Sequence, residues 1–315
     1  MMTSFLVGPS SLCAQNSRPK VKPARKRAGR NQNALKGATV EIYKTIGDVQ
    51  LKMYLFKPKN HQPEHRKPAI VFFFGGGWRA GSPAQFGLHC QYLASRGMVA
   101  MAADYRVESR HQTKAIHCVA DAKSAIRWIR KNSKRLGIDP NKIVAAGGSA
   151  GGHLAAATAT ISGFNEKGES TEISSQPNAL ILFNPALNLT PAAFNESPDS
   201  KRMKGLQNRL GTEFRNLSPV FHISKTTPPC IIFHGEADKT VPFKQATEFA
   251  AAMKKRGLSC EVAGYPDEGH GFFNFGRKGN VAFLSTLSRA DAFLVSLGYL
   301  KGNGNVKEFF KMSNK

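Results

Sequence analysis

Residues 143–152 read IVAAGGSAGG, and this stretch decides the fold. Its apolar half is typical of a strand buried on both faces, and the next residues, HLAAATATI, have the composition of a helix. A G-x-S-x-G pattern between a strand and a helix indicates a turn so sharp that neighbouring side chains are not tolerated. We therefore predict that Ser149 is a nucleophile projecting from the carboxyl edge of a sheet, near the N-terminus of a helix.

Strands and helices alternate on both sides of this turn. The expected strands are two half-buried antiparallel ones and six largely buried ones: 38–46, 49–58, 68–74, 98–106, 138–148, 179–187, 230–235 and 260–266. The expected helices cover 84–96, 117–136, 153–161, 199–210, 243–256 and 281–297. This alternation predicts an α/β fold in which helices cover both faces of a mostly parallel sheet.

A nucleophilic serine needs a base, and the base needs an acid that orients it. Asp238 follows the predicted strand CIIFHG, and His270 lies between glycines after the predicted strand CEVAGYP. Both can reach the sheet edge that carries Ser149, and the order Ser, Asp, His is the one expected on this fold. Glu236 is the alternative acid. His234 is the alternative base, but it precedes the acid.

The glycines of IVFFFGGGW, residues 70–78, lie directly after an early strand. Acyl transfer creates an oxyanion, which backbone N–H groups can stabilise by about 3–4 kcal/mol per donor. A loop without Cβ atoms, Gly75–Gly77, can pass the reacting carbonyl closely, and the N–H of Ala150 lies next to the nucleophile. These residues are therefore predicted to form an oxyanion hole.

Five motifs occur in a fixed order: GGGW at 75–78, DYR at 104–106, GGSAGGHLA at 147–155, HGEADKTVP at 234–242 and EGHGF at 268–272. In these motifs the region from about Val40 to Leu297 resembles the α/β-hydrolase superfamily. It is similar to the esterase/lipase branch related to hormone-sensitive lipase and to bacterial carbohydrate-ester and feruloyl-type esterases. The resemblance implies a set of site residues and no cofactor; the residues are the triad Ser149, Asp238 and His270 and the oxyanion donors Gly76, Gly77 and Ala150.

One position departs from the family pattern. The family usually has histidine before the glycines, where this chain has Phe74. Phenylalanine cannot donate a hydrogen bond but can anchor the loop by packing, so the oxyanion hole is expected to persist. Phe74, Gly75 and Trp78 are therefore predicted to support the loop, and the acyl preference stays open.

The sequence also predicts a domain organisation. The expected segments are a truncated signal peptide at 1–15, a basic disordered linker at 16–37, a catalytic domain at 38–300 with a lid-like insertion at 186–225, and a C-terminal tail at 301–315. Export to the periplasm or the outside is the expected location, and no segment is apolar and long enough to span a membrane.

The charge distribution and the cysteine spacing indicate which binding partners and metals to expect. The formal net charge is +24, and residues 16–36 carry eight basic residues and no acid. This segment is either a solvated linker or a contact for a polyanion, and it indicates no specific nucleic acid. The four downstream cysteines lack the paired spacing of a zinc site, so no metal is predicted and a disulfide stays open: Cys90, Cys118, Cys230 and Cys260.

Three other functions are alternatives to an esterase. Gly75–Ala80 formally fits a dinucleotide fingerprint, but Gly81, Ser82 and Pro83 interrupt the helix that this fingerprint requires. A non-catalytic binding protein would be expected to lack a triad member. A serine amidase or peptidase would share the triad. The prediction is a serine carboxylic-ester hydrolase for short-chain acyl or acetyl esters, on small molecules or on polysaccharide.

Overall fold

The computed structural model describes residues 1–2 and 32–312. The predicted signal segment, apart from its first two residues, and the predicted linker up to residue 31 lie outside the described residues. Within the described part, no helix is long and apolar enough to cross a membrane.

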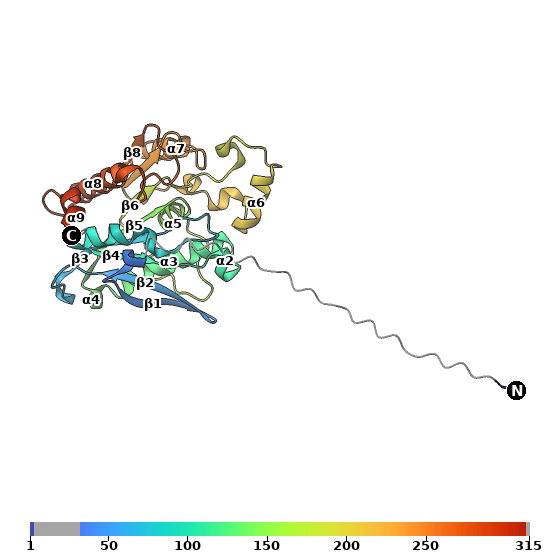
Figure 1. Ribbon diagram of the computed structural model, residues 1–315, viewed down its shortest axis with the longest axis horizontal. Helices are drawn as coiled ribbons and strands as arrows, with labels where there is room; N and C mark the ends of the chain where they lie inside the picture. The colour runs from blue at the N-terminus through green and yellow to red at the C-terminus, as the bar shows by residue number, and fades with distance from the viewer. Residues whose placement is uncertain (3–31, 313–315) are drawn as a thin grey trace. The chain divides into compact units, whose positions relative to one another are not determined.

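The described strands form one eight-stranded sheet in the order β1-β2-β4-β3-β5-β6-β7-β8. Their bounds are β1 Thr39–Ile46, β2 Val49–Phe56, β3 Lys67–Phe73, β4 Val99–Ala103, β5 Ile138–Gly148, β6 Ala179–Phe183, β7 Cys230–Gly235 and β8 Cys260–Tyr265. β2 pairs antiparallel with β1 and β4, and all other neighbours are parallel. Figure 1 traces the alternation of these strands with helices. The predicted α/β-hydrolase fold is confirmed.

Helices cover both faces of the sheet. The described helices are α1 Gly87–Ser95, α2 Glu108–His111, α3 Ala115–Lys131, α4 Ser133–Leu136, α5 Ala150–Thr160, α6 Lys201–Leu210, α7 Lys244–Lys254, α8 Val281–Ser296 and α9 Val306–Met312. Short 3₁₀ helices are η2 Gln32–Leu35, η3 Pro63–His65, η4 Pro83–Phe86, η5 Pro191–Phe194, η6 Phe214–Leu217, η7 Pro219–His222 and η8 Lys278–Asn280. α3, α5 and α7 contribute to one apolar cluster, and α1, α8 and α9 contribute to the other.

The alternation of side chains in β3 explains the two clusters. Ala69, Val71 and Phe73 pack into the cluster with α3 and α5, whereas Ile70 and Phe72 pack into the cluster with α1 and α8. Since successive side chains of a strand point to opposite faces, a strand covered on both faces must be apolar throughout. This is why the continuous apolar runs of the sequence became the central strands.

The structure differs from the expected segments at three places. The helix expected over 117–136 is interrupted at Asn132, whose side-chain amide donates to the Trp128 carbonyl and competes with the backbone ladder. Residues 32–35, expected in the linker, form η2, where Ala34 is buried and its carbonyl accepts from Gln91. Residues 306–312, expected in the tail, form α9, which packs against α8 through apolar side chains.

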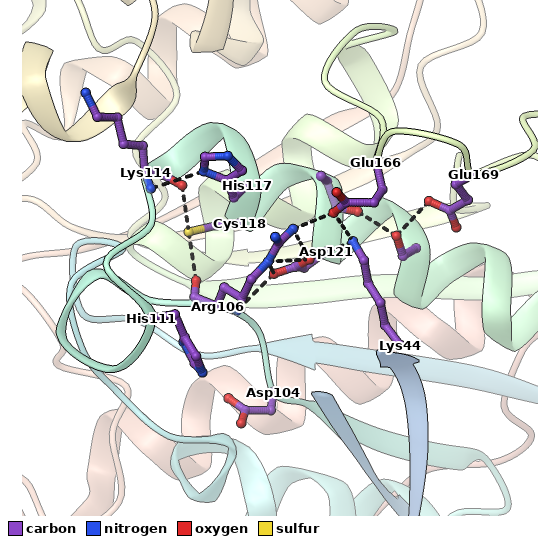
Figure 2. A network of polar contacts seen from close by, with 12 residues as sticks. Lys44, Asp104, Arg106, His111, Lys114, His117, Cys118, Asp121, Glu166 and Glu169 are labelled. Carbon is purple, nitrogen blue, oxygen red and sulfur yellow. Dashed lines mark hydrogen bonds and ion pairs between the residues drawn. The ribbon is translucent and has the colours of Figure 1, made fainter. Parts of the chain in front are cut away.

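A network of buried charges fastens α3 to the sheet. Lys44 of β1 and Arg106, after β4, both bind the Asp121 carboxylate of α3, and Glu166 binds both cations (Figure 2). Asp121 is fully buried and also accepts from the backbone N–H of Arg106 at 2.9 Å. Arg106 belongs to the DYR motif, so that motif helps to join α3 to the segment after β4.

Candidate active site

Ser149 lies on the sharp turn between β5 and α5. Its backbone has φ 54° and ψ −118°, and its N–H donates to the Phe183 carbonyl at 2.9 Å. A Cβ atom on Gly147 would lie 2.5 Å from the carbonyl oxygen of Gly151, and one on Gly151 would lie 2.0 Å from the Phe73 carbonyl. Both contacts are impossible, so the serine can occupy this turn only because its flanking residues are glycines.

The structure brings the three predicted residues together in one chain of hydrogen bonds. The His270 Nε2 atom lies 2.9 Å from the Ser149 hydroxyl oxygen, and its Nδ1 atom lies 2.7 Å from the Asp238 carboxylate. Asp238 lies on the loop after β7, and His270 on the loop after β8. The imidazole can therefore accept the serine proton while the carboxylate orients it.

Asp238 is held as a carboxylate by several donors. Its Oδ1 atom accepts from the backbone N–H groups of Thr240 and Val241, at 2.8 and 3.0 Å. Burial opposes ionisation, but hydrogen bonds from His234 and His270 and from the Val241 N–H outweigh it and hold the pKa of Asp238 well below its usual range. The site therefore contains a fixed negative charge behind the imidazole.

The alternative acid and base occupy other positions. The His234 ring is fully buried, with its Nε2 atom 2.9 Å from the Val241 carbonyl and 3.4 Å from the Asp238 carboxylate. His234 thus contacts the acid rather than the serine. The Glu236 residue is exposed, and its backbone N–H pairs with Tyr265 of β8.

The glycine loop is held at its N-terminal end, at Phe74 and Gly75. The Phe74 ring stacks on Tyr105 with centroids 4.0 Å apart, and the Tyr105 hydroxyl donates to the Phe74 carbonyl at 2.7 Å. The Gly75 N–H donates to the side chain of Gln85 at 2.6 Å, and Gln85 in turn donates to Asn274 at 2.9 Å. Phe74 therefore anchors the loop by packing, and the N–H of Gly75 is used for support.

Three backbone N–H groups are predicted as oxyanion donors, and two of these residues, Gly77 and Ala150, line the same cavity as Ser149. No hydrogen bond among residues 32–312 uses the N–H of Gly76, Gly77 or Ala150. Gly76 has φ 129°, and a Cβ there would lie 2.0 Å from the Ala80 carbonyl, so only glycine fits. Trp78, after the loop, is buried with its ring edge-on to His153.

Asn184 lies beside the site and is not among the residues that the sequence predicts. It follows β6 with φ 34°, is fully buried, and accepts from the Gly271 N–H at 2.9 Å. The contact fixes the loop that carries His270. The available signal was a polar residue directly after the buried run ALILF, the position from which the other site residues also project.

A cavity of about 280 Å³ lies beside Ser149. The glycine loop, the turn after Ser149, the insertion with α6 and the loop after Asp238 line it; examples are Gly77, Ala150, Leu206 and Val241. The yellow segment between β6 and β7 in Figure 1, which contains α6, thus contributes one wall. Among the described residues, no group of three or more His, Cys, Asp or Glu side chains is placed to hold a metal ion.

Comparison with protein families gives two matches. The BD-FAE family matches residues 53–253, which is most of the catalytic region, and the dienelactone hydrolase family matches residues 214–294. Ser149 lies within the first match, and Asp238 and His270 lie within the second. Both matches therefore fall on segments that contribute to the site.

Individual known proteins that are similar to this chain are also esterases. The chain is 30% identical over 226 residues to esterase LipC of Mycobacterium tuberculosis, covering 68% of this chain and 55% of LipC. It is 54% identical to propionate-bound esterase 2 of Thermogutta terrifontis, with TM-score 0.80, covering 86% of this chain and 98% of that one. The same esterase phosphorylated by paraoxon gives 53% identity and TM-score 0.79, covering 85% and 97%. The chain spans about half the length of the curated relatives it matches.

Proposed function

Because this chain belongs to the α/β-hydrolase esterase family that the BD-FAE match identifies, we propose that it is a serine carboxylic-ester hydrolase acting on short-chain acyl esters. The observation that carries the proposal is the chain of hydrogen bonds from Ser149 through His270 to Asp238. The same arrangement would serve an amidase, and the relatives named above are esterases.

The geometry leads to a two-stage mechanism. His270 removes the proton from Ser149 as the serine oxygen attacks the ester carbonyl, and Asp238 stabilises the resulting imidazolium. The alcohol leaves with the proton from His270, which forms an acyl-enzyme on Ser149. Water, activated by the same imidazole, then releases the acid and restores the serine.

Both tetrahedral intermediates carry an oxyanion. The N–H groups of Gly76, Gly77 and Ala150 would bind it, and no other hydrogen bond among residues 32–312 uses them. Donors fixed before the reaction are worth about 3–4 kcal/mol each in the transition state. Tyr105 and Gln85 therefore contribute to catalysis in this proposal, because they hold the glycine loop whose N–H groups bind the oxyanion.

The size of the cavity and the neighbours favour a short acyl group. A cavity of about 280 Å³ lies at the small end of small-molecule sites. A close structural neighbour binds propionate and another of its structures contains butyrate. Acetyl groups on polysaccharide, export, and polyanion contact through residues 16–36 remain predictions.

The first experiment compares turnover of p-nitrophenyl acetate, butyrate and octanoate with that of an aminoacyl p-nitroanilide. We expect ester turnover that falls with chain length, and a loss of at least about a thousandfold in Ser149→Ala. Ser288→Ala, an exposed serine on α8, is the matched control. Anilide turnover above that of every ester would replace the esterase by an amidase.

Paraoxon provides an independent measurement. We expect one equivalent to inactivate the enzyme and peptide mass spectrometry to find the added diethylphosphoryl group on Ser149. Modification elsewhere, or retained activity in Ser149→Ala, would contradict the assigned nucleophile.

A further inference from the structure

The cavity beside Ser149 has an uneven charge. Its charged lining residues are Lys201, Arg202 and Arg209, all from α6, and no acidic residue lines it in the described chain. The other lining side chains are mainly apolar or small. A neutral short-chain ester would use none of these three cations.

Arg202 already has partners. Its guanidinium binds Glu196 at 3.0 Å and the Thr240 carbonyl at 2.8 Å, and it lies over the Phe194 ring at 4.8 Å. These contacts fix Arg202 at the rim of the cavity. Lys201, at the start of α6, is exposed.

Arg209 is different. It is half-buried in the last turn of α6, and within residues 32–312 it forms no hydrogen bond and no ion pair. Its Nη1 atom lies 3.7 Å from the position that a Cβ on Gly77 would occupy. The guanidinium therefore lies near the glycine loop, and Arg209 and Ser149 line the same cavity.

The surroundings disfavour the charge of Arg209. Burial and the neighbouring Arg79 lower its pKa, and Glu108 opposes this only in part. Glu108 itself pairs with Arg79 at 3.3 Å. Arg209 also lines a second hollow, where Arg79, Glu108 and Lys114 are the other charged lining residues. A half-buried cation without a partner would be stabilised by an anion delivered with the substrate.

Resting on the proposed esterase function, we propose that Arg209 binds a carboxylate carried by the ester substrate, so that the enzyme prefers anionic esters. The planar guanidinium can bind a carboxylate with two parallel hydrogen bonds. The substrate class is then either half-esters of short dicarboxylic acids or acyl esters of hydroxy-carboxylic acids. The net charge of +24 would also attract such substrates.

Two matched pairs of substrates distinguish the two sources of the carboxylate. The p-nitrophenyl monoester of adipate against p-nitrophenyl hexanoate tests an anionic acyl part. 4-Acetoxybenzoate against 4-acetoxybenzamide tests an anionic alcohol part. The measured quantity is the ratio of kcat/KM for the anionic ester over its neutral partner, and one pair is expected to give a ratio above one.

Variants at Arg209 test the assignment. Arg209→Met should lower that ratio by about ten- to a hundredfold, as expected for a charge-assisted hydrogen bond. Arg209→Lys should retain part of the ratio, and Arg209→Glu should reverse the preference toward a cationic ester such as 4-(aminomethyl)phenyl acetate. Arg289→Met, an exposed arginine on α8, is the control and should keep the wild-type ratio.

The outcomes separate this inference from the proposed function. If wild-type enzyme hydrolyses neutral esters but both ratios stay the same in Arg209→Met, the carboxylate site is wrong and the esterase stands. If no ester is hydrolysed at all, the proposed function fails first. A ratio that falls equally in Arg289→Met would assign the preference to overall charge and overturn the role of Arg209.

Discussion

The Tyr105 hydroxyl helps to fix the backbone next to the proposed oxyanion donors. The Tyr105 side chain is fully buried, and its hydroxyl donates to the Phe74 carbonyl while its ring packs on Phe74. The family usually has histidine at position 74, where this chain relies on aromatic packing. The start of the glycine loop is therefore held in part by a hydrogen bond between two motifs that lie 31 residues apart in the sequence.

Tyr105→Phe removes that hydrogen bond and should lower both the stability and the activity of the enzyme. Leaving the buried Phe74 carbonyl without a donor is expected to reduce the free energy of unfolding by about 1–3 kcal/mol. Because the loop then holds its N–H groups less firmly, kcat should fall about tenfold while KM changes little. Steady-state kinetics and urea unfolding measure the two effects.

Tyr54→Phe is the control for this prediction, since Tyr54 is half-buried on β2 and its hydroxyl forms no hydrogen bond in the described chain. It should behave like wild type. A Tyr105→Phe enzyme with unchanged kcat would show that packing of the Phe74 ring alone fixes the loop.

At the scale of elements, the strands and the turns after them were the predictable part. Continuous apolar runs became the central strands, and Ser149, Asp238 and His270 follow strand ends, as their positions indicated. Asn184 and Gln85 were not predicted, because a polar loop residue gains its partner only from the folded arrangement. Asn184 binds a loop 87 residues away, and no local pattern specifies that contact.

Helix α6 offers an element-scale prediction. Gly205 lies in its interior, is exposed, and has open space where a Cβ would be. Gly205→Ala should stabilise the enzyme by about 0.5–1 kcal/mol, because alanine loses less conformational freedom in a helix. Gly205 also lines the cavity, so kcat/KM for bulky esters should fall more than that for acetate esters.

Thermal unfolding and a series of esters of increasing size check both parts. Ser200→Ala should change the stability of α6 in the opposite direction. The Ser200 hydroxyl caps α6 by accepting a hydrogen bond from the Met203 N–H. The substitution should destabilise the enzyme by about 1 kcal/mol. A Gly205→Ala enzyme that is less stable than wild type would contradict this account of α6.

At the scale of the whole molecule, charge is distributed between a buried network and a strongly basic surface. The network of Lys44, Arg106, Asp121 and Glu166 joins β1, the segment after β4, α3 and the loop after α5. The charge excess was visible in the sequence. The pairing was not, because it depends on segments up to 122 residues apart.

Asp121→Asn should be strongly destabilising. It leaves two buried cations with reduced compensation, which is expected to cost about 3–5 kcal/mol in the free energy of unfolding. Glu261→Gln, which breaks an exposed pair with Arg289, is the control and should cost less than about 1 kcal/mol. Similar losses for both variants in denaturant unfolding would refute the role of the network.

Two buried histidines predict a dependence of stability on pH. Burial lowers the pKa of His89 to about 3, inside a cage of phenylalanine rings. Burial also lowers the pKa of His153 to about 4, although its hydrogen bond to the Leu217 carbonyl partly opposes the shift. The folded protein therefore keeps both rings neutral at pH values where the unfolded chain protonates them.

These lowered pKa values determine the direction in which folding stability changes with pH. Below the unfolded pKa of about 6.5 the unfolded state binds more protons, so stability falls as pH falls from about 6.5 toward 4 and 3. Between pH 8 and pH 5 each ring should remove about 2 kcal/mol. His89→Leu should recover about 2 kcal/mol of that loss, measured by unfolding at both pH values. An unchanged pH dependence in His89→Leu would contradict the assignment.

The position of β8 at the edge of the sheet affects the temperature at which the enzyme loses activity. β8 is the last strand of the sheet and pairs with β7 alone among the described strands, and His270 follows it. Edge strands open locally more readily than central ones. Opening of this edge would withdraw the base while the central strands stay folded. Heat should therefore abolish catalytic activity at a lower temperature than it abolishes the far-ultraviolet circular dichroism signal. Cooling from a temperature between the two transitions should restore the activity.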